Sequence, residues 1–196
     1  MRKIMVGEFV SLDGVMQAPG DPQEDTEGGF TRGGWQIPYF DADANRIMDE
    51  NMAAMDALLL GRLTYQIFAA YWPSAPEEEL YAKKLNSVPK YVVSTTLNKV
   101  EWNNSTLIKK NVVEEIAKLK KQPSSGTMSV IGSGRLAQTL MQHNLVDEYV
   151  LWIHPIILGS GKRLFADGIS PASLKLVETR ITGSGVSVLR YLPDTK

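Results

Sequence analysis

The sequence predicts an α/β protein with three layers, in which helices cover both faces of a mixed, mostly parallel sheet. Three observations predict this class. Short apolar runs typical of buried strands alternate with amphipathic helical patterns through most of the chain. Two of these runs end on glycine and pass directly into a helical pattern, as parallel strand–helix units do. The last two strands flank Gly183-Ser184-Gly185, which predicts an antiparallel C-terminal hairpin.

Composition limits the classes of function. The 196 residues, 43% of them hydrophobic, suit a single domain spanning 1–196. A net charge of −1 gives no basic surface for nucleic acid. The absence of cysteine excludes disulfides, thiolate nucleophiles and cysteine metal sites, and the two histidines lack metal-ligand spacing, so we expect no metal. With no signal peptide and no stretch that spans a bilayer, we expect a soluble, cytoplasmic protein with a small-molecule partner and no membrane partner.

The apolar N-terminal segment predicts a central strand over residues 3–10, and Ser11-Leu12-Asp13-Gly14 follows it. Asp13 would then stand at the carboxyl end of a strand, the edge where open α/β sheets bind ligands. The alternative is a plain Asp-Gly turn, which the spacing alone favours.

The segment 17–39 is the longest stretch without periodicity, and it combines five glycines and three prolines with Phe30, Trp35 and Tyr39. A loop of this length is usually functional or disordered, and the aromatic residues argue against disorder. It is either a lid over a flat ligand or a cover packed on the sheet edge.

The next three elements are a helix, a strand and a second helix. Residues 41–55 predict a helix, and its methionines, Met48 among them, are expected to fill the core, the alternative being that they line a ligand site. Residues 57–60 form a buried strand that ends at Gly61, and Arg62 opens the second helix. A cation weakens the N-terminus of a helix unless an anion lies nearby, so Arg62 indicates a bound phosphate.

The middle of the chain continues the alternation. A capping box at Ser74 and Glu77 starts a helix, and residues 90–94 form a strand. Ser94-Thr95-Thr96 follows it and could hold a phosphate or make a turn. A short strand over 106–108 precedes a helix that Asn111 and Glu114 are expected to cap.

The stretch around Gly132-Ser133-Gly134 carries the strongest signal. A buried strand over 128–131 breaks on these residues, and a helical pattern with Leu136 on its apolar face follows at once. Free amides and the positive end of the helix dipole can bind a phosphate there. The alternative is that Ser133 and Gly134 only cap the helix. A strand over 147–158 then leads to the hairpin strands, 174–181 and 186–191.

These motifs together resemble a known family. Gly61-Arg62-x-Thr64-Tyr65, Ser94-Thr95 and Gly132-Ser133-Gly134-Arg135 are similar to dihydrofolate reductase. Leu145-Val146-Asp147-Glu148, Pro155 to Gly161 and Ser11-Leu12-Asp13-Gly14 resemble the reductase domain of riboflavin biosynthesis. The resemblance covers nearly the whole chain in one consistent order.

The resemblance implies about eight strands, four or so helices and NADPH bound along the strand ends. It assigns Arg62 and Thr64 to the adenosine phosphates, Ser94 to the ribose 2′-phosphate, and Gly132 and Gly134 to the pyrophosphate. The cofactor set is completed by Gly61, Thr95, Ser133, Arg135 and Leu136. The expected substrate side comprises Asp13, Gly14, Trp35, Met48 and Leu158.

Two positions depart from the family pattern. Ile131 stands where the riboflavin reductases carry a glutamate, and the carboxylate position of dihydrofolate reductases falls near Asn45. Asp41, Asp43 and Asp49 are its acidic neighbours.

We therefore expect an NADPH-dependent reductase that acts on a pyrimidine-like or pteridine-like ring or a ring-opened sugar, resembling 5-amino-6-(5-phosphoribosylamino)uracil reductase. Asp13 is the candidate for orienting substrate or relaying a proton. The alternatives are dihydrofolate reductase-type activity and a non-catalytic nucleotide-binding protein. The apolar C-terminal strands could pair across a two-fold axis as a homodimer.

Overall fold

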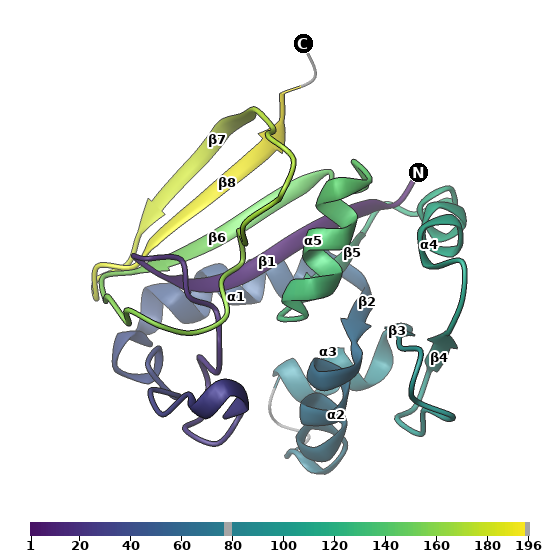
Figure 1. Cartoon of the computed structure of the whole chain (residues 1–196), viewed down its shortest axis with the longest axis horizontal. Helices are drawn as coiled ribbons and strands as arrows, with labels where there is room; N and C mark the ends of the chain where they lie inside the picture. The colour runs from purple at the N-terminus through teal and green to yellow at the C-terminus, as the bar shows by residue number, and fades with distance from the viewer. Residues whose placement is uncertain (77–79, 195–196) are drawn as a thin grey trace.

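The computed structural model describes residues 1–76 and 80–194, which form one eight-stranded sheet with helices on both faces (Figure 1). The strands are β1 (Lys3–Ser11), β2 (Met55–Gly61), β3 (Lys90–Val93), β4 (Ser105–Ile108), β5 (Thr127–Ile131), β6 (Glu148–His154), β7 (Leu174–Ile181) and β8 (Ser187–Pro193). Their order is β4-β3-β2-β5-β1-β6-β8-β7. Pairing is parallel from β4 to β6 and antiparallel for β8 and β7, which confirms the predicted fold class.

The helices are α1 (Ala42–Ala54), α2 (Arg62–Tyr71), α3 (Leu80–Ser87), α4 (Val112–Lys120) and α5 (Gly134–Gln142), with 3-10 turns η1 (Glu27–Gly29), η2 (Ile37–Tyr39) and η3 (Trp72–Ser74). Successive side chains of β2 point to opposite faces of the sheet and show which helices cover each face. Ala57 and Leu59 pack with α4 and α5, whereas Leu58 and Leu60 pack with α2 and α3. Helix α1 lies on the opposite side of the sheet from α5 (Figure 1).

The chain reverses direction across the sheet in a way that positions a site. The chain passes from β1 to β2 on one side of it, and β5 later lies between these two strands. The chain then passes from β5 to β6, which lies on the other side of β1. The helices that follow β1 and β5 therefore lie on opposite faces. Ligands of open α/β sheets bind at such a switch point, beyond the carboxyl ends of the strands.

Three local predictions are corrected or left open. The strand predicted over 147–158 ends at His154, because Pro155 has no N–H and the chain turns away to cover the sheet edge. Asn111 is the N-cap of α4, but its φ is +50° and its side chain makes no capping bond. Glu77, half of the predicted capping box, lies outside the described residues.

No helix within the described residues is long and apolar enough to cross a bilayer. Strand β7 forms one free edge of the sheet and exposes Leu176, Val177 and Ile181. The predicted pairing of two copies through these strands stays a prediction.

Candidate functional site

The N-termini of α2 and α5 lie side by side at the carboxyl edge of the sheet. The Gly61 N–H donates to Ser133 Oγ at 2.9 Å, and the Ser133 N–H donates to Thr64 Oγ1 at 2.9 Å. Neither N-cap residue, Gly61 or Ser133, makes a side-chain capping bond to its helix. The free N–H groups and the positive dipole ends of both helices are therefore directed at the same region. Such an arrangement suits an anion.

The glycine turn between β5 and α5 is held in an uncommon backbone conformation. Gly132 has φ +61° and Ser133 has φ +59°, the left-handed region that disfavours a residue with a Cβ. The two bonds of Ser133 to the β2–α2 junction hold it there. A Cβ at Gly132 would lie 3.0 Å from Thr64 Oγ1, so this close approach of the two junctions also requires glycine.

Gly134 begins α5 and has a different neighbour. A Cβ there would lie 2.8 Å from the sulfur of Met16 in the segment after β1. A side chain at this position would therefore require the end of the flexible Met16 side chain to shift.

Two cations stand beside these N-termini. Arg62 is exposed in the first turn of α2, where its Nη1 donates to Gln66 Oε1 at 2.9 Å. Arg135 is exposed in the first turn of α5. Since no acidic residue occupies either first turn, both helix ends are left electropositive.

Glu8 is a residue of this site that the sequence analysis missed. It is 3% exposed, and its Oε2 accepts the Gly132 N–H at 3.0 Å. Burial raises the pKa of Glu8 well above its ordinary value, and the bond to Gly132 offsets only part of that. The available signal was an acidic residue inside the apolar run from Val6 to Val10.

Two predicted cofactor residues have other partners. The hydroxyl of Ser94 accepts from the N–H groups of Thr96 and Leu97 at 3.2 and 3.0 Å, which is the turn alternative. Thr95 is exposed at the same edge. The assignment of Leu136 is corrected: its side chain packs in the core and its N–H donates to the Ser133 carbonyl, so it offers no group to a ligand.

Asp13 joins the end of β1 to the segment after β6. Its carboxylate accepts from the Ser11 hydroxyl at 2.7 Å and from the Leu158 and Gly159 N–H groups at 3.1 and 2.8 Å. These bonds, led by that from Ser11, lower the pKa of Asp13 to about 2. Gly14 turns the chain with φ +82°. The geometry favours the structural alternative, because the two carboxylate oxygens already accept from three donors of the chain itself.

The expected substrate side is filled by an aromatic cluster, Phe9, Trp35, Tyr39 and His154. The rings of Trp35, Phe9 and Tyr39 meet the His154 ring edge-on, with centroids 5.1, 5.7 and 5.7 Å away. Burial lowers the pKa of His154, so the imidazole is neutral at pH 7. Leu158 belongs to one apolar cluster with Trp35, and Met48 packs against a second one; Phe9 borders both.

The loop predicted over 17–39 packs on the sheet edge, as one of its two alternatives proposed. The Trp35 indole donates to the Gln17 carbonyl at 2.8 Å. Lys162, from the segment after β6, pairs with Asp25 and Glu27, each at 2.6 Å. In Figure 1 this loop, in dark purple, lies beyond the end of β1.

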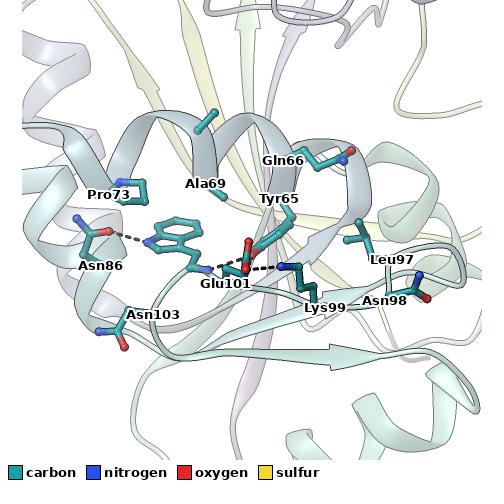
Figure 2. Close-up of a pocket in the computed structure, with 12 residues that line it drawn as sticks. Tyr65, Gln66, Ala69, Pro73, Asn86, Leu97, Asn98, Lys99, Glu101 and Asn103 are labelled. Atoms are coloured by element: carbon teal, nitrogen blue, oxygen red, sulfur yellow. Dashed lines mark hydrogen bonds and ion pairs between the residues drawn. The ribbon is translucent and has the colours of Figure 1, made fainter.

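A hollow of about 810 Å³ lies between α2 and the segment 97–103 (Figure 2). Its buried polar groups bond to one another. Tyr65 Oη accepts from the N–H groups of Glu101 and Trp102 at 2.9 and 3.1 Å, and the Trp102 indole donates to Asn86 Oδ1 at 2.6 Å. These bonds attach the segment to α2 and α3, away from the glycine turn.

The sheet order and the paired helix N-termini define an α/β protein of the dihydrofolate reductase-like fold. The chain belongs to the RibD C-terminal domain family, whose model matches residues 2–188. It is 37% identical over 194 residues to the uncharacterized protein YyaP of Bacillus subtilis (strain 168), covering 97% of this chain and 94% of that protein.

Two solved structures share the fold. A putative riboflavin biosynthesis protein from Shewanella sp. PV-4 is 21% identical, with a TM-score of 0.69 and coverage of 98% of this chain and 99% of that one. Dihydrofolate reductase from Enterococcus faecalis, complexed with NADP(H), is 13% identical, with a TM-score of 0.60 and coverage of 98% and 96%. At these identities the likeness shows the fold alone.

Proposed function

We propose that this protein is a reductase of the RibD and dihydrofolate reductase type that uses NADPH. Membership of the RibD C-terminal domain family and the reductase-like neighbours support the reductase class. The substrate we propose is a pyrimidine-like or pteridine-like ring or a ring-opened sugar.

The observation that carries the proposal is the junction of two uncapped helix N-termini, bonded to each other through Ser133. A diphosphate fits this arrangement, because it can accept from the amides of both helices at once. Arg62 and Arg135 are exposed beside these N-termini and would supply the compensating charge, Arg62 to the additional phosphate that distinguishes NADPH from NADH.

When bound, the cofactor supplies the hydride, and the chain's own residues bind, orient and exclude water. The aromatic cluster covers the end of β1. Two of its members, Trp35 and Tyr39, belong to the 17–39 loop, and the Trp35 indole is bonded to Gln17 of the same loop. A flat substrate ring would enter by displacing Trp35 or Tyr39 from His154, and it would then lie between aromatic faces out of contact with water.

The test has two stages. Titration of the protein with NADPH and NADH, followed by nicotinamide fluorescence, should give tighter binding of NADPH. NADPH oxidation is then measured with a panel of dihydropterins, folates and aminouracils. We expect oxidation with at least one of them, and a protein that binds neither nicotinamide cofactor contradicts the proposal.

A second candidate is a nucleotide-binding protein without turnover. It is favoured because the acidic residues near α1, which were candidates for holding a substrate, are engaged elsewhere or exposed. Asp41 caps α1 at Ala44 N and accepts from Ser184 N, and Asp43 pairs with Arg46. Asp49 is exposed. None of these three carboxylates belongs to the aromatic cluster, so tight NADPH binding with no oxidation across the panel would select this candidate.

A further inference from the structure

Glu8 is the unusual ionisable group of the described residues. Its second carboxyl oxygen, Oε1, is buried and has no hydrogen-bond partner, and the Gly132 N–H is the partner of Oε2. Glu148, the other buried glutamate of the sheet, pairs with Arg190. A buried carboxylate without a cation is costly in its charged form, whereas a neutral carboxylic acid is not.

The position of Glu8 is fixed by the sheet. Gly7 of β1 is in register with Ile131 of β5, so the next residue on each strand brings Glu8 beside Gly132. Strand alternation places Glu8 on the same face as Val6 and Val10, which pack against α5. Glu8 therefore lies directly beneath the turn that opens the anion site.

Two consequences follow for an anion bound there. The Gly132 N–H is already occupied by Glu8, which leaves the Gly134 and Arg135 amides to contact the ligand. A phosphate bound at the Gly134 amide would lie two peptide units along the turn from Gly132, the residue that Glu8 contacts. An ionised Glu8 would repel it, because the protein interior screens charge poorly.

We propose that Glu8 is a positioning residue that holds the glycine turn through Gly132 and is a neutral carboxylic acid when a phosphate-bearing cofactor is bound, so that binding takes up a proton wherever Glu8 is ionised in the free protein. This inference rests on the proposed binding of NADPH. The chain would thereby bind the cofactor less tightly as the pH rises.

The sign of the dependence follows from linkage. If the bound phosphates raise the pKa of Glu8 beyond its value in the free protein, the complex holds more protons than its separate parts. Affinity then falls as the pH rises through the pKa of the free protein, by up to about tenfold per pH unit for one proton.

Other groups near Glu8 do not titrate between pH 7 and 9.5. Strand β5 carries no ionisable residue. On the same face of β6, burial raises the pKa of Tyr149 further. Burial opposes the charged form of Lys162 after β6, but its partners Asp25 and Glu27 raise the pKa of Lys162 overall, so it stays cationic. Arg135 lies on α5 and Arg163 lies after β6. Glu27 in the covering loop has a lowered pKa and stays anionic.

The experiment is a set of NADPH titrations between pH 7 and 9.5 on the wild type, Glu8→Gln and Glu148→Gln. The window lies above the pKa of about 6 of a phosphate monoester, so the 2′-phosphate stays ionised. We expect the wild-type Kd to rise with pH and the Glu8→Gln Kd to stay flat, with Glu8→Gln binding at least about tenfold tighter at pH 9.5. Glu148→Gln, the matched buried control, should follow the wild type.

Calorimetry of the wild type gives a readout that needs no variant. At the pH where the wild-type Kd rises most steeply, the binding enthalpy measured in two buffers of different ionisation enthalpy should show proton uptake. A wild-type Kd that parallels Glu8→Gln, or binding without proton uptake, overturns the inference while leaving NADPH binding intact. Absence of NADPH binding at every pH contradicts the proposed function and this inference with it.

Discussion

Asp13, the predicted group for orienting substrate or relaying a proton, is a carboxylate whose hydrogen bonds also fix a distant loop. It accepts hydrogen bonds from Ser11, Leu158 and Gly159, and these lower its pKa to about 2. A lowered pKa contributes stability above the unfolded value of about 3.9 and loses it as the pH falls through 2.

We therefore predict that Asp13→Asn flattens the loss of stability between pH 4 and 2, measured by urea unfolding against the wild type. NADPH oxidation should change little, because an amide oxygen can still accept from two of the three donors. A large fall in turnover with unchanged cofactor affinity would instead return Asp13 to a catalytic role.

Arg62 is the residue on which cofactor choice is expected to depend. Arg62→Ala should weaken NADPH binding by about 1–3 kcal/mol, the range for hydrogen bonds to a charged group, and should affect NADH less. Arg46→Ala is a suitable control, because Arg46 is also an exposed helical arginine and is paired with Asp43 and Glu50. Equal loss for both cofactors, or none, would remove the phosphate assignment of Arg62.

At the scale of elements, Lys90 joins β3 to α3 and to the segment 97–103. The residue is fully buried, and its Nζ donates to the carbonyls of Val88 and Asn103 at 2.9 Å and of Asn86 at 3.2 Å. It also lies 4.3 Å from the Trp102 ring centroid. Burial lowers the pKa of Lys90 to about 8.

Lys90→Met should reduce the free energy of unfolding by about 1–3 kcal/mol at pH 7, because three buried carbonyls lose their donor. The unfolded chain binds more protons than the folded one between pH 8 and about 10.4, so wild-type stability gains a favourable contribution across that window that the variant lacks. Urea unfolding at pH 7.5 and 10 measures both effects. The exposed Lys99→Met is the control, and equal pH slopes for wild type and Lys90→Met would contradict the burial argument.

At the scale of the whole molecule, the sheet runs without interruption through all eight strands, so the described chain should unfold as one unit. NADPH at a hundred times its Kd should stabilise the folded state by about 2.7 kcal/mol. For a chain of this size that raises the Tm by roughly 5–11 °C. Calorimetry should show a single transition that moves as a whole; two transitions, only one of them shifted, would contradict a single domain.

The sequence by itself determined the order of strands and helices, the two strand–glycine–helix junctions and the C-terminal hairpin. These features depend on local patterns: apolar periodicity, glycine where the backbone turns, and an uncompensated arginine at a helix start. They sufficed to predict the fold class, and they located Gly61, Arg62, Gly132 and Gly134 at one edge.

Only the tertiary structure decided which groups meet there. Glu8 and Gly132 are 124 residues apart, Gly61 and Ser133 are 72 apart, and Asp13 and Leu158 are 145 apart. Strand register decides whether a carboxylate such as Glu8 is buried without a cation, or accepts hydrogen bonds from a distant loop as Asp13 does. Neither leaves a periodic trace in the sequence, because hydrogen-bond partners are selected by position in the fold rather than by separation along the chain.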